Sequence, residues 1–476
     1  MNDIIFWPAA KMAAAIRDKE VSTREVVDAH LARIAAVNPA LNAVVQLAAE
    51  RAQAEARQRD IALARDALLG PLHGVPFTVK DSLCTEGIIT TAGTLGRTSF
   101  LSARDATAVA RLRAAGGILL GKTNCTELCG SGETDNLVYG RTNNPYDLTR
   151  SPGGSSGGEA AIIAAGGSPL GLASDFGGSI RGPAHLCGVA GLNPTFGRVP
   201  RTGHIPPYGG AYDTARIGLM ARFVEDLALA LPIIAGPDGM DPSIVPIALG
   251  SPKTVNLPEL RVAFHTDNGI YPATRETATV VRNAAQALAD AGLIVAEACP
   301  PGLAQLMEVG ATLGCVNALA EQTGVYVEFG QPLDFDADTL RQSSEVWLTR
   351  ARGMKQAELM SAAELLAWTR RWDLARSEML AFLARFDVIL CPVDPHPALP
   401  HGATMRPDFP PFGVTAYTKP YSMAGWPSVV VRADASPAGM PIGVQIVAGP
   451  WQEHVALAVA QTIERAWGGW RKSPLW

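Results

Sequence analysis

The sequence predicts an α/β protein in which helices cover both faces of a central β-sheet. Short apolar segments typical of strands alternate with segments of helical periodicity along much of the 476-residue chain. The 47 glycines and 35 prolines are spread over the whole chain, and no long linker marks a domain boundary. A hydrophobic fraction of 47% and a charged fraction of 18% are ordinary for a globular protein with a large core. We therefore predict one domain over residues 1–476.

The N-terminal elements follow from capping and periodicity. Residues 22–25, Ser-Thr-Arg-Glu, form a capping box that places the start of a helix at Ser22. Apolar side chains recur at helical spacing after it, and we expect this helix to end at Asn38-Pro39. The alanine-rich stretch 47–69 predicts a second helix. Residues 76–79 predict a short buried strand that leads directly into Lys80.

The alternation continues toward the C-terminus. A helix is expected near residues 106–115 and a strand over 118–120, followed by a loop rich in glycine and asparagine. Residues 301–385 change character and predict a helical insertion, with a helix over 362–386. The closing elements are strands over 388–390, 428–431 and 443–447 and a helix over 453–467.

Composition sets expectations for partners and compartment. The net charge of −5 and the absence of a Lys/Arg-rich run argue against a nucleic-acid partner. The seven cysteines are scattered, which favours a reducing, cytoplasmic compartment, and no second Cys or His pair completes a metal site with Cys125 and Cys129. The N-terminus lacks a signal-peptide pattern and no apolar stretch is long enough to span a bilayer, so no membrane partner is expected.

Two glycine-rich segments carry the chemistry, Gly-Gly-Ser-Ser-Gly-Gly at 153–158 and Asp-Phe-Gly-Gly-Ser-Ile-Arg at 175–181. Glycine lets the backbone approach a ligand closely. A P-loop would need Lys-Ser or Lys-Thr after its last glycine, whereas Glu159-Ala160 follow here, so a nucleotide site is not expected. Residues 153–157 also match the G-x-S-x-G elbow with Ser155 as nucleophile, but the preceding residues 147–152 predict a turn instead of the required strand.

A longer pattern is much more specific. Lys80 within Gly-Val-Pro-Phe-Thr-Val-Lys-Asp (74–81), the 153–158 segment and Gly-Gly-Ser-Ile-Arg (177–181) together resemble the amidase signature family. Segments 121–124, 187–188, 224–227, 425–428 and 441–445 add to the likeness, which covers nearly the whole chain and is weakest across the insertion. The resemblance implies a mixed central sheet and a hydrolase, needing no cofactor, that cleaves a carboxylic amide-type C–N bond in an amide, anilide or carbamate, or an ester.

The resemblance also implies the catalytic roles: Ser179 as nucleophile, Ser155 as a bridging serine that follows a cis peptide bond, and Lys80 as base. A serine hydroxyl is a weak nucleophile until a neighbouring base removes its proton. A lysine can be that base only when neutral, a state that burial favours. Ser155 would pass the proton from Ser179 to Lys80 and later to the leaving amine.

The loop before the nucleophile is expected to bind the oxyanion through the backbone N–H groups of Phe176, Gly177, Gly178 and Ser179. Each such donor can contribute about 3–4 kcal/mol to lowering the barrier. Asp175 and Arg181 are expected to pair and hold the loop, and Ser156 to form hydrogen bonds around the triad. Phe176 stands where the family usually has a smaller aliphatic residue or threonine, which predicts an altered acyl pocket.

Substrate contacts are expected from Cys129, Gly130 and Ser131, with pocket walls from residues 126–136, 208–212 and the insertion. Small residues there favour a bulky or aromatic small-molecule amide, anilide or carbamate, and family likeness suggests a homodimer. The alternative function is the glutamine-hydrolysing amidase subunit of a tRNA-dependent amidotransferase complex.

Two alternatives for the catalytic groups stay open at this point. Lys122 follows an apolar strand as Lys80 does, so pattern alone makes it a rival base. A Ser-His-Asp triad would need one of the candidate histidines as base. These are His185, His396, His401 and His454.

Overall fold

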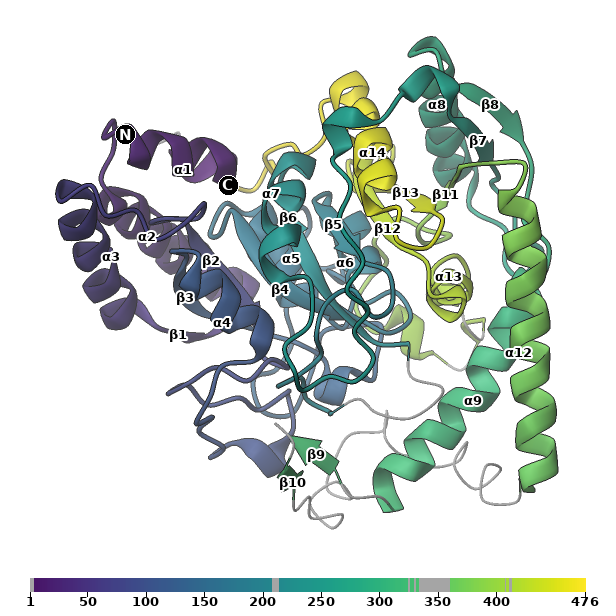
Figure 1. The fold of residues 1–476 in the computed structure, drawn as a ribbon, viewed down its shortest axis with the longest axis horizontal. Coiled ribbons are helices and arrows are strands. Elements are labelled where there is room, and N and C mark those ends of the chain that lie inside the picture. The colour runs from purple at the N-terminus through teal and green to yellow at the C-terminus, as the bar shows by residue number, and fades with distance from the viewer. Residues whose placement is uncertain are drawn as a thin grey trace.

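A computed structural model describes residues 4–207, 214–323, 326–328, 331–333, 360–406, 408–410 and 413–476. The described chain is built on an 11-stranded sheet with the order β1-β3-β2-β4-β6-β5-β12-β13-β11-β7-β8 (Figure 1). Its strands are β1 (Val44–Leu47), β2 (Pro76–Lys80), β3 (Ile118–Thr123), β4 (Leu170–Asp175), β5 (Ala190–Asn193), β6 (Arg216–Ala221), β7 (Arg261–Phe264), β8 (Ile294–Glu297), β11 (Val388–Pro392), β12 (Ser428–Ala435) and β13 (Pro441–Ala448). A separate pair is formed by β9 (Tyr326–Glu328) and β10 (Gln331–Leu333).

The sheet is mixed, as expected. β2 runs parallel to both β3 and β4, and β7 runs parallel to both β8 and β11. The other pairs in the 11-stranded sheet are antiparallel. Because the carboxyl ends of parallel neighbours meet at one edge of the sheet, the ends of β2 and β4 lie side by side there.

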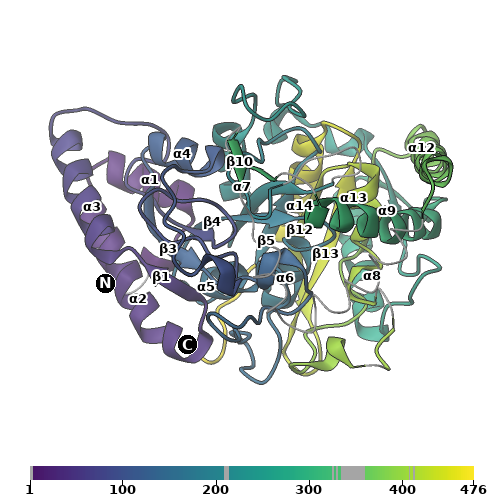
Figure 2. The ribbon, with the colours of Figure 1, turned by 90° about the horizontal axis from the view of Figure 1, so that it is seen from below.

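Helices cover both faces of the sheet, which confirms the predicted architecture (Figures 1 and 2). One apolar core joins α1 (Ala9–Arg17), α4 (Thr107–Ala114), α7 (Val224–Ile234), α8 (Arg275–Asp290) and α14 (Glu453–Trp467) to one face. A second core joins α2 (Thr23–Leu41), α3 (Ala49–Ala64), α5 (Gly157–Ala164) and α6 (Arg181–Cys187) to the other. Alternate residues of a strand enter alternate cores: Val429 and Val431 pack in the first and Val430 in the second.

A third core lies over the β13-β11-β7 end of the sheet and involves the predicted insertion. It joins α9 (Leu303–Thr323), α12 (Ala362–Leu383) and α13 (Lys419–Ala424) to side chains of β11 and β13. In Figure 1, α9 and α12 lie at the edge of the molecule farthest from α2 and α3. The insertion predicted over 301–385 is therefore helical in its described flanks, while residues 334–359 lie outside the described part of the chain.

Local signals were accurate at helix starts and less so at helix ends. The Ser22 capping box is present: Glu25 N–H donates to Ser22 Oγ at 3.1 Å, and Ser22 N–H donates to Glu25 Oε2 at 2.8 Å. The expected end at Asn38-Pro39 was wrong, because α2 continues to Leu41 and ends at Asn42 in the left-handed conformation. Pro39 removes one backbone donor but leaves the last turn intact, since Asn42 N–H still reaches Asn38 O at 2.7 Å.

The two ends of the described chain pack together, and the surface carries both signs of charge. The Phe6 ring stacks on Trp470 with 5.5 Å between ring centroids.

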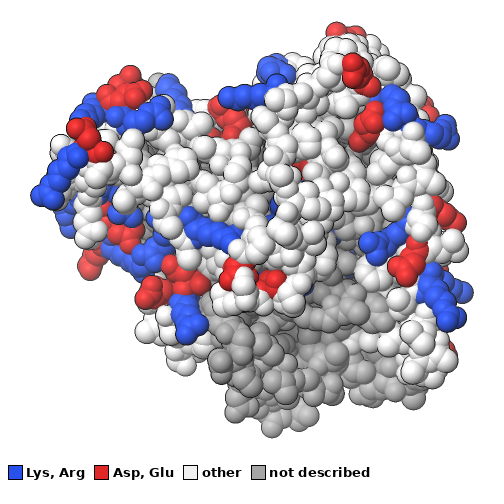
Figure 3. Space-filling view, in the orientation of Figure 1, with Lys and Arg blue, Asp and Glu red and all other residues white. Residues whose placement is uncertain are grey.

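On the face shown in Figure 3, acidic and basic side chains are interspersed over the coloured part of the surface. Among the described helices, none combines the length and apolar composition that crossing a bilayer requires.

The buried carboxyl of Asp226 in α7 is expected to make the free energy of unfolding depend on pH. Its buried carboxyl accepts a hydrogen bond from Ala10 N–H at 2.9 Å, and burial raises its pKa to about 7. A carboxyl whose folded pKa is raised contributes most stability below about pH 4, and that stability is lost as the pH rises toward 7. We expect Asp226→Asn, which keeps the acceptor for Ala10, to raise the free energy of unfolding at pH 8 by about 1–3 kcal/mol.

Denaturant unfolding at pH 4 and pH 8 measures this effect, which should be largely absent at pH 4. The matched control is Glu225→Gln, because Glu225 is the exposed neighbour in the same helical turn and should show little change at either pH. A variant less stable than the wild type at pH 8 would contradict the prediction and show that ionised Asp226 is stabilised by Arg222.

Candidate active site

Lys80 and Ser174 meet where the parallel strands β2 and β4 end. Lys80 Nζ lies 2.6 Å from Ser155 Oγ, 3.0 Å from Ser174 Oγ and 3.5 Å from Ser174 O. The side chains of Lys80 and Ser155 are fully buried, and Ser174 is nearly so. The structure thus brings together the predicted base and the predicted bridging serine, with Ser174 as an additional partner of the lysine.

Ser155 lies in a tight loop that leads into α5. The bond between Gly154 and Ser155 is cis, as the family resemblance implied. A Cβ on Gly154 would lie 2.8 Å from Ser131 O and 2.9 Å from Thr126 Cγ2, so only glycine fits there. The residues before Ser155 form no strand, which excludes the nucleophile-elbow interpretation.

Ser179 is more exposed to solvent than Ser155. It is half-buried, whereas Ser155 is buried completely. The two segments touch, because Ser156 N–H donates to Ser179 O at 3.3 Å. Ser156 Oγ also donates to Ser174 O at 3.3 Å, so this side chain forms a hydrogen bond to the same residue that Lys80 contacts.

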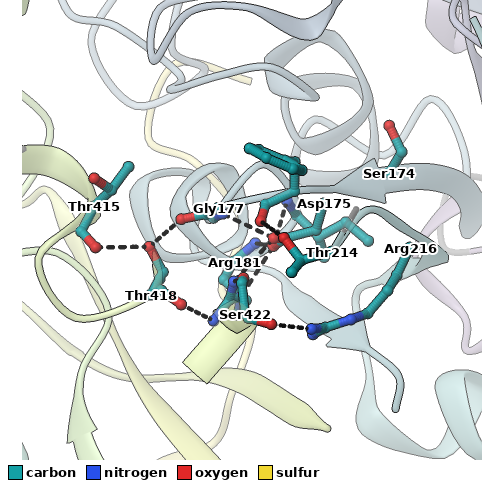
Figure 4. Close-up of polar contacts among 12 residues, drawn as sticks. Ser174, Asp175, Gly177, Arg181, Thr214, Arg216, Thr415, Thr418 and Ser422 are labelled. Atoms are coloured by element: carbon teal, nitrogen blue, oxygen red, sulfur yellow. Dashed lines mark hydrogen bonds and ion pairs between the residues drawn. The ribbon is translucent and has the colours of Figure 1, made fainter. Parts of the chain in front are cut away.

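The loop that carries Ser179 is held by a buried ion pair between Asp175 and Arg181 (Figure 4). Arg181 Nε and Nη2 each lie 2.9 Å from a different oxygen of Asp175. The remaining guanidinium donors reach Thr418 O at 2.8 Å, Gln445 Oε1 at 2.9 Å and Ser422 Oγ at 2.5 Å. Burial alone would raise the pKa of Asp175, but the Arg181 charge and hydrogen bonds lower it to about 2.

The backbone carbonyls of this loop are also fixed. Thr418 Oγ1 donates to Gly177 O at 2.6 Å and Thr214 Oγ1 to Phe176 O at 3.3 Å (Figure 4). Of the four N–H groups expected in the oxyanion hole, that of Gly178 already donates to Asp175 Oδ1 at 2.7 Å. Within the described residues, the N–H groups of Phe176, Gly177 and Ser179 have no hydrogen-bond acceptor.

Lys122, the rival base, belongs to a separate buried cluster. Its Nζ donates to Leu83 O and Thr85 Oγ1, and it lies 3.8 Å from Asp81 Oδ1. Burial lowers the pKa of Lys122, while the Asp81 charge opposes the shift. Among the described residues it has no hydrogen bond to Ser155, so it does not share the contact that Lys80 makes.

The candidate histidines of a Ser-His-Asp triad are engaged elsewhere. His185 bonds the backbone of Gly443 and His396, His401 lies 3.2 Å from Leu148 O, and His396 contacts Asp394. In the described part of the chain, neither these three nor His454 is hydrogen-bonded to Ser155 or Ser179.

The histidine nearest the site was missed by sequence reasoning. His204 Nε2 lies 2.7 Å from Ser174 Oγ. Ser174 carried a weak signal, since it is a polar residue near the end of an otherwise apolar strand. His204 carried none, because a histidine in a loop of glycine and proline could face any direction.

Of the three predicted substrate residues, Cys129 lies beside Ser174, the partner of Lys80. Cys129 Sγ is 4.0 Å from Ser174 Oγ, Gly130 is exposed and Ser131 is half-buried. Burial alone would raise the pKa of Cys129, but the positive charge of Lys80 is the main opposing cause and the pKa is lowered to about 5. The predicted wall segment 208–212 lies outside the described residues.

Phe176 has an unexpected neighbour, a lysine from α13. Lys419 Nζ lies 3.5 Å from the centroid of the Phe176 ring. A Cβ on Gly177 would lie 3.0 Å from Lys419 Cδ, and one on Gly310 of α9 would lie 3.0 Å from Lys419 Cε. A cation therefore lies against the loop that carries Ser179, and it is packed under a helix of the predicted insertion.

Comparisons with known proteins show which family and which solved structures this chain resembles. The Amidase family model matches residues 25–457. The chain is 35% identical over 470 residues to a glutamyl-tRNA(Gln) amidotransferase subunit of Synechococcus sp. (strain CC9605), covering 95% of this chain and 94% of the relative. Among solved structures, 6-aminohexanoate cyclic dimer hydrolase superposes with a TM-score of 0.85 at 30% identity over 99% of both chains. The peptide amidase of Stenotrophomonas maltophilia gives 0.82 at 28% identity over 98% of both chains.

The first of these relatives corrects the prediction that nucleic acid plays no part. That relative is named as a subunit of an enzyme acting on a glutamyl-tRNA, so the exclusion drawn from composition was wrong. The physical reason is that the net charge of one chain does not report the ligand of an assembly. A complex can bind RNA through local groups or through other subunits while this chain stays mildly acidic.

The buried lysine and serine contact, the clamped loop before Ser179 and the family match over residues 25–457 lead to one conclusion. The chain is an amide-hydrolysing enzyme and belongs to the amidase signature family.

Proposed function

We propose that the chain hydrolyses its amide through an acyl-enzyme on Ser179, with Ser155 and Lys80 as the proton relay. The observation that carries this proposal is the 2.6 Å contact between Lys80 Nζ and Ser155 Oγ at the foot of the Ser179 loop. A buried amine next to a hydroxyl is the arrangement that general-base activation of a serine requires.

The steps follow from that arrangement. Ser179 Oγ attacks the carbonyl carbon while its proton moves to Ser155 and the proton of Ser155 moves to Lys80. When the tetrahedral intermediate collapses, the relay runs in reverse and protonates the leaving amine. Water then attacks the acyl carbon and gives its proton to the same relay. The bond to Ser179 Oγ breaks, Ser179 takes the proton back from the relay, and the acid leaves.

The negative oxygen of the intermediate would be bound by the N–H groups of Phe176, Gly177 and Ser179. Asp175, Thr418 and Thr214 fix this loop before the reaction, so its dipoles need no rearrangement when charge develops. We leave Gly178 out of the set because its N–H is bonded to Asp175.

For the substrate, we propose glutamine, with the chain acting as the amidase subunit of a tRNA-dependent amidotransferase. The support is the 35% identity over 95% of the chain to a protein of that name. The Lys419 ammonium beside Phe176 adds a physical reason, because it can pair with the carboxylate that glutamine carries and a simple amide lacks. The tRNA would be held by the assembled complex. The cytoplasmic location stays a prediction.

A second candidate is hydrolysis of small-molecule amides without partner subunits. It is favoured by the match to 6-aminohexanoate cyclic dimer hydrolase over 99% of both chains. In that case the small residues near Cys129 would leave room for a larger acyl group.

The test combines a substrate panel with trapping of the intermediate. The purified chain, alone and with candidate partner subunits, is assayed for ammonia or amine release from glutamine, neutral aliphatic amides, anilides and carbamates. Hydroxylamine is added to capture the acyl group as a hydroxamate. Glutamine turnover that partner subunits raise supports the amidotransferase assignment, whereas turnover of neutral amides alone supports the free hydrolase. A lack of hydroxamate from a turned-over substrate would count against an acyl-enzyme.

Lys419→Met separates the two candidates further. If Lys419 pairs with the substrate carboxylate, the variant should raise KM for glutamine about 10- to 100-fold, since a hydrogen bond to a charged group contributes about 1.5–3 kcal/mol. KM for neutral amides should change little. Lys472→Met is the matched control, because Lys472 also lies over a phenylalanine ring, that of Phe6 at 5.2 Å, away from the site. Equal changes for charged and neutral substrates would contradict a carboxylate-binding role.

A further inference from the structure

Ser174 Oγ lies between two basic groups, and the triad uses only one of them. Lys80 Nζ is 3.0 Å away and His204 Nε2 is 2.7 Å away. Ser174 is 2% exposed and His204 is 1% exposed, so water does not compete for these contacts. His204 comes from the loop between β5 and β6, which is not part of the family pattern described above.

The contact of His204 Nδ1 with Pro206 indicates which ring nitrogen carries the proton. Nδ1 lies 3.0 Å from Pro206 O, and a carbonyl oxygen can only accept. Nδ1 is therefore the donor, and in neutral His204 the lone pair is on Nε2. The hydroxyl of Ser174 must then donate to Nε2, which leaves its own lone pairs facing Lys80. Ser82 Oγ approaches the same nitrogen at the longer distance of 3.3 Å.

The direction of the hydrogen bond from Ser174 to His204 affects how Lys80, the proposed base, is oriented. A neutral lysine has two N–H bonds and one lone pair, and its neighbours are Ser155 Oγ, Ser174 Oγ and Ser174 O. With the Ser174 hydroxyl committed to His204, both oxygens of Ser174 can only accept from Lys80. The two N–H bonds are drawn to Ser174, and the lone pair faces the hydroxyl of Ser155, where a base must have it.

Removing the acceptor at His204 would free the Ser174 hydroxyl to rotate. Its proton could then donate to the Lys80 lone pair, in competition with Ser155. Cys129 also faces this cluster, but its Sγ lies 4.0 Å from Ser174 Oγ, a much longer contact than the 2.7 Å to His204 Nε2.

We propose that His204 is a positioning residue that fixes Ser174 as a hydrogen-bond acceptor and thereby aims the lone pair of Lys80 at Ser155. This inference rests on the proposed base role of Lys80. It assigns a function to a histidine outside the proposed triad.

The test is a double-mutant cycle on the full chain, with the best substrate of the panel. His204→Leu, which removes the acceptor, should lower kcat about 10- to 100-fold with KM nearly constant, the effect of one misdirected hydrogen bond to a reacting group. His204→Gln places an amide oxygen near Ser174 and should restore much of kcat. In a Ser174→Ala background no hydroxyl remains to misdirect, so adding His204→Leu should lower kcat no further.

The matched control is His30→Leu, because His30 is equally buried and its Nδ1 bonds Val26 O at 2.8 Å, away from the site. It should leave kcat within about threefold. Unchanged kcat in His204→Leu, equal losses in His204→Leu and His204→Gln, or multiplicative effects with Ser174→Ala would each overturn the proposal. If His204→Leu fails to fold, His204→Ala takes its place with the same expectations. Full activity in Lys80→Ala would instead remove the proposed base, which keeps the two failures distinct.

Discussion

Replacing Ser179 by alanine is expected to lower kcat for amide hydrolysis by at least about 10⁴-fold, because the variant has no nucleophile to form the acyl-enzyme. Ser155 cannot substitute for it, since its side chain is fully buried against Lys80. Binding should be retained, because the N–H groups of the loop and the pocket are unchanged. Release of ammonia or amine under single-turnover conditions measures the effect, and calorimetry with the inactive variant measures the binding.

Ser168→Ala is the matched control for this loss. Ser168 is also buried and lies just before β4, but its hydroxyl donates to Leu170 O at 2.7 Å, at the end of the strand remote from Ser174. It should retain activity within about threefold. Persistent turnover in Ser179→Ala would mean that the nucleophile is elsewhere, and Ser155 would be the next residue to test.

Replacing Arg181 by methionine is expected to lower the free energy of unfolding by about 3–5 kcal/mol, the usual cost of removing one partner of a buried ion pair. The change leaves Asp175 buried and ionised with only backbone donors, and it strips Thr418 O, Ser422 Oγ and Gln445 Oε1 of their donor. Activity should fall as well, because these contacts tie α13 to the loop before Ser179 (Figure 4). Urea unfolding followed by far-UV circular dichroism gives the stability.

Arg261→Met tests whether burial is what makes the Arg181 pair important. Arg261 also holds Asp387 through two contacts, at 2.9 Å and 3.0 Å, but the two side chains are 41% and 34% exposed. We expect a much smaller loss there than in Arg181→Met, because water solvates both partners after the change. Similar losses in the two variants would contradict the argument from burial.

Local patterns in the sequence determined much of this protein. The Ser22 capping box, the strand before Lys80 and the closing helix over 453–467 depend on residues close in the chain, and the structure contains all three. The paired glycine-rich segments, together with Lys80, were specific enough to indicate the family that the comparisons show. Helix ends were less predictable, as Pro39 illustrates, because a proline in the last turn costs one hydrogen bond without stopping the helix.

The sequence pattern alone could not distinguish Lys80 from Lys122 as the base. Both follow apolar strands and both are fully buried, so their chemistry depends on what faces each ammonium. Lys80 meets Ser155 and Ser174, whereas Lys122 meets Asp81 and the backbone of Leu83. These partners are brought together by strand pairing and loop packing over long sequence separations.

The sequence by itself therefore determined the fold class, the family and the residue types of the reaction, because these depend on periodicity and on motifs contiguous in the chain. Only the tertiary structure decided which groups face one another: Gly178 N–H and Asp175, Ser174 and both Lys80 and His204, and Lys419 and the Phe176 ring. Hydrogen bonds and cation contacts act over a few ångströms and depend on orientation. Their partners become neighbours only when strands and loops far apart in the sequence have packed.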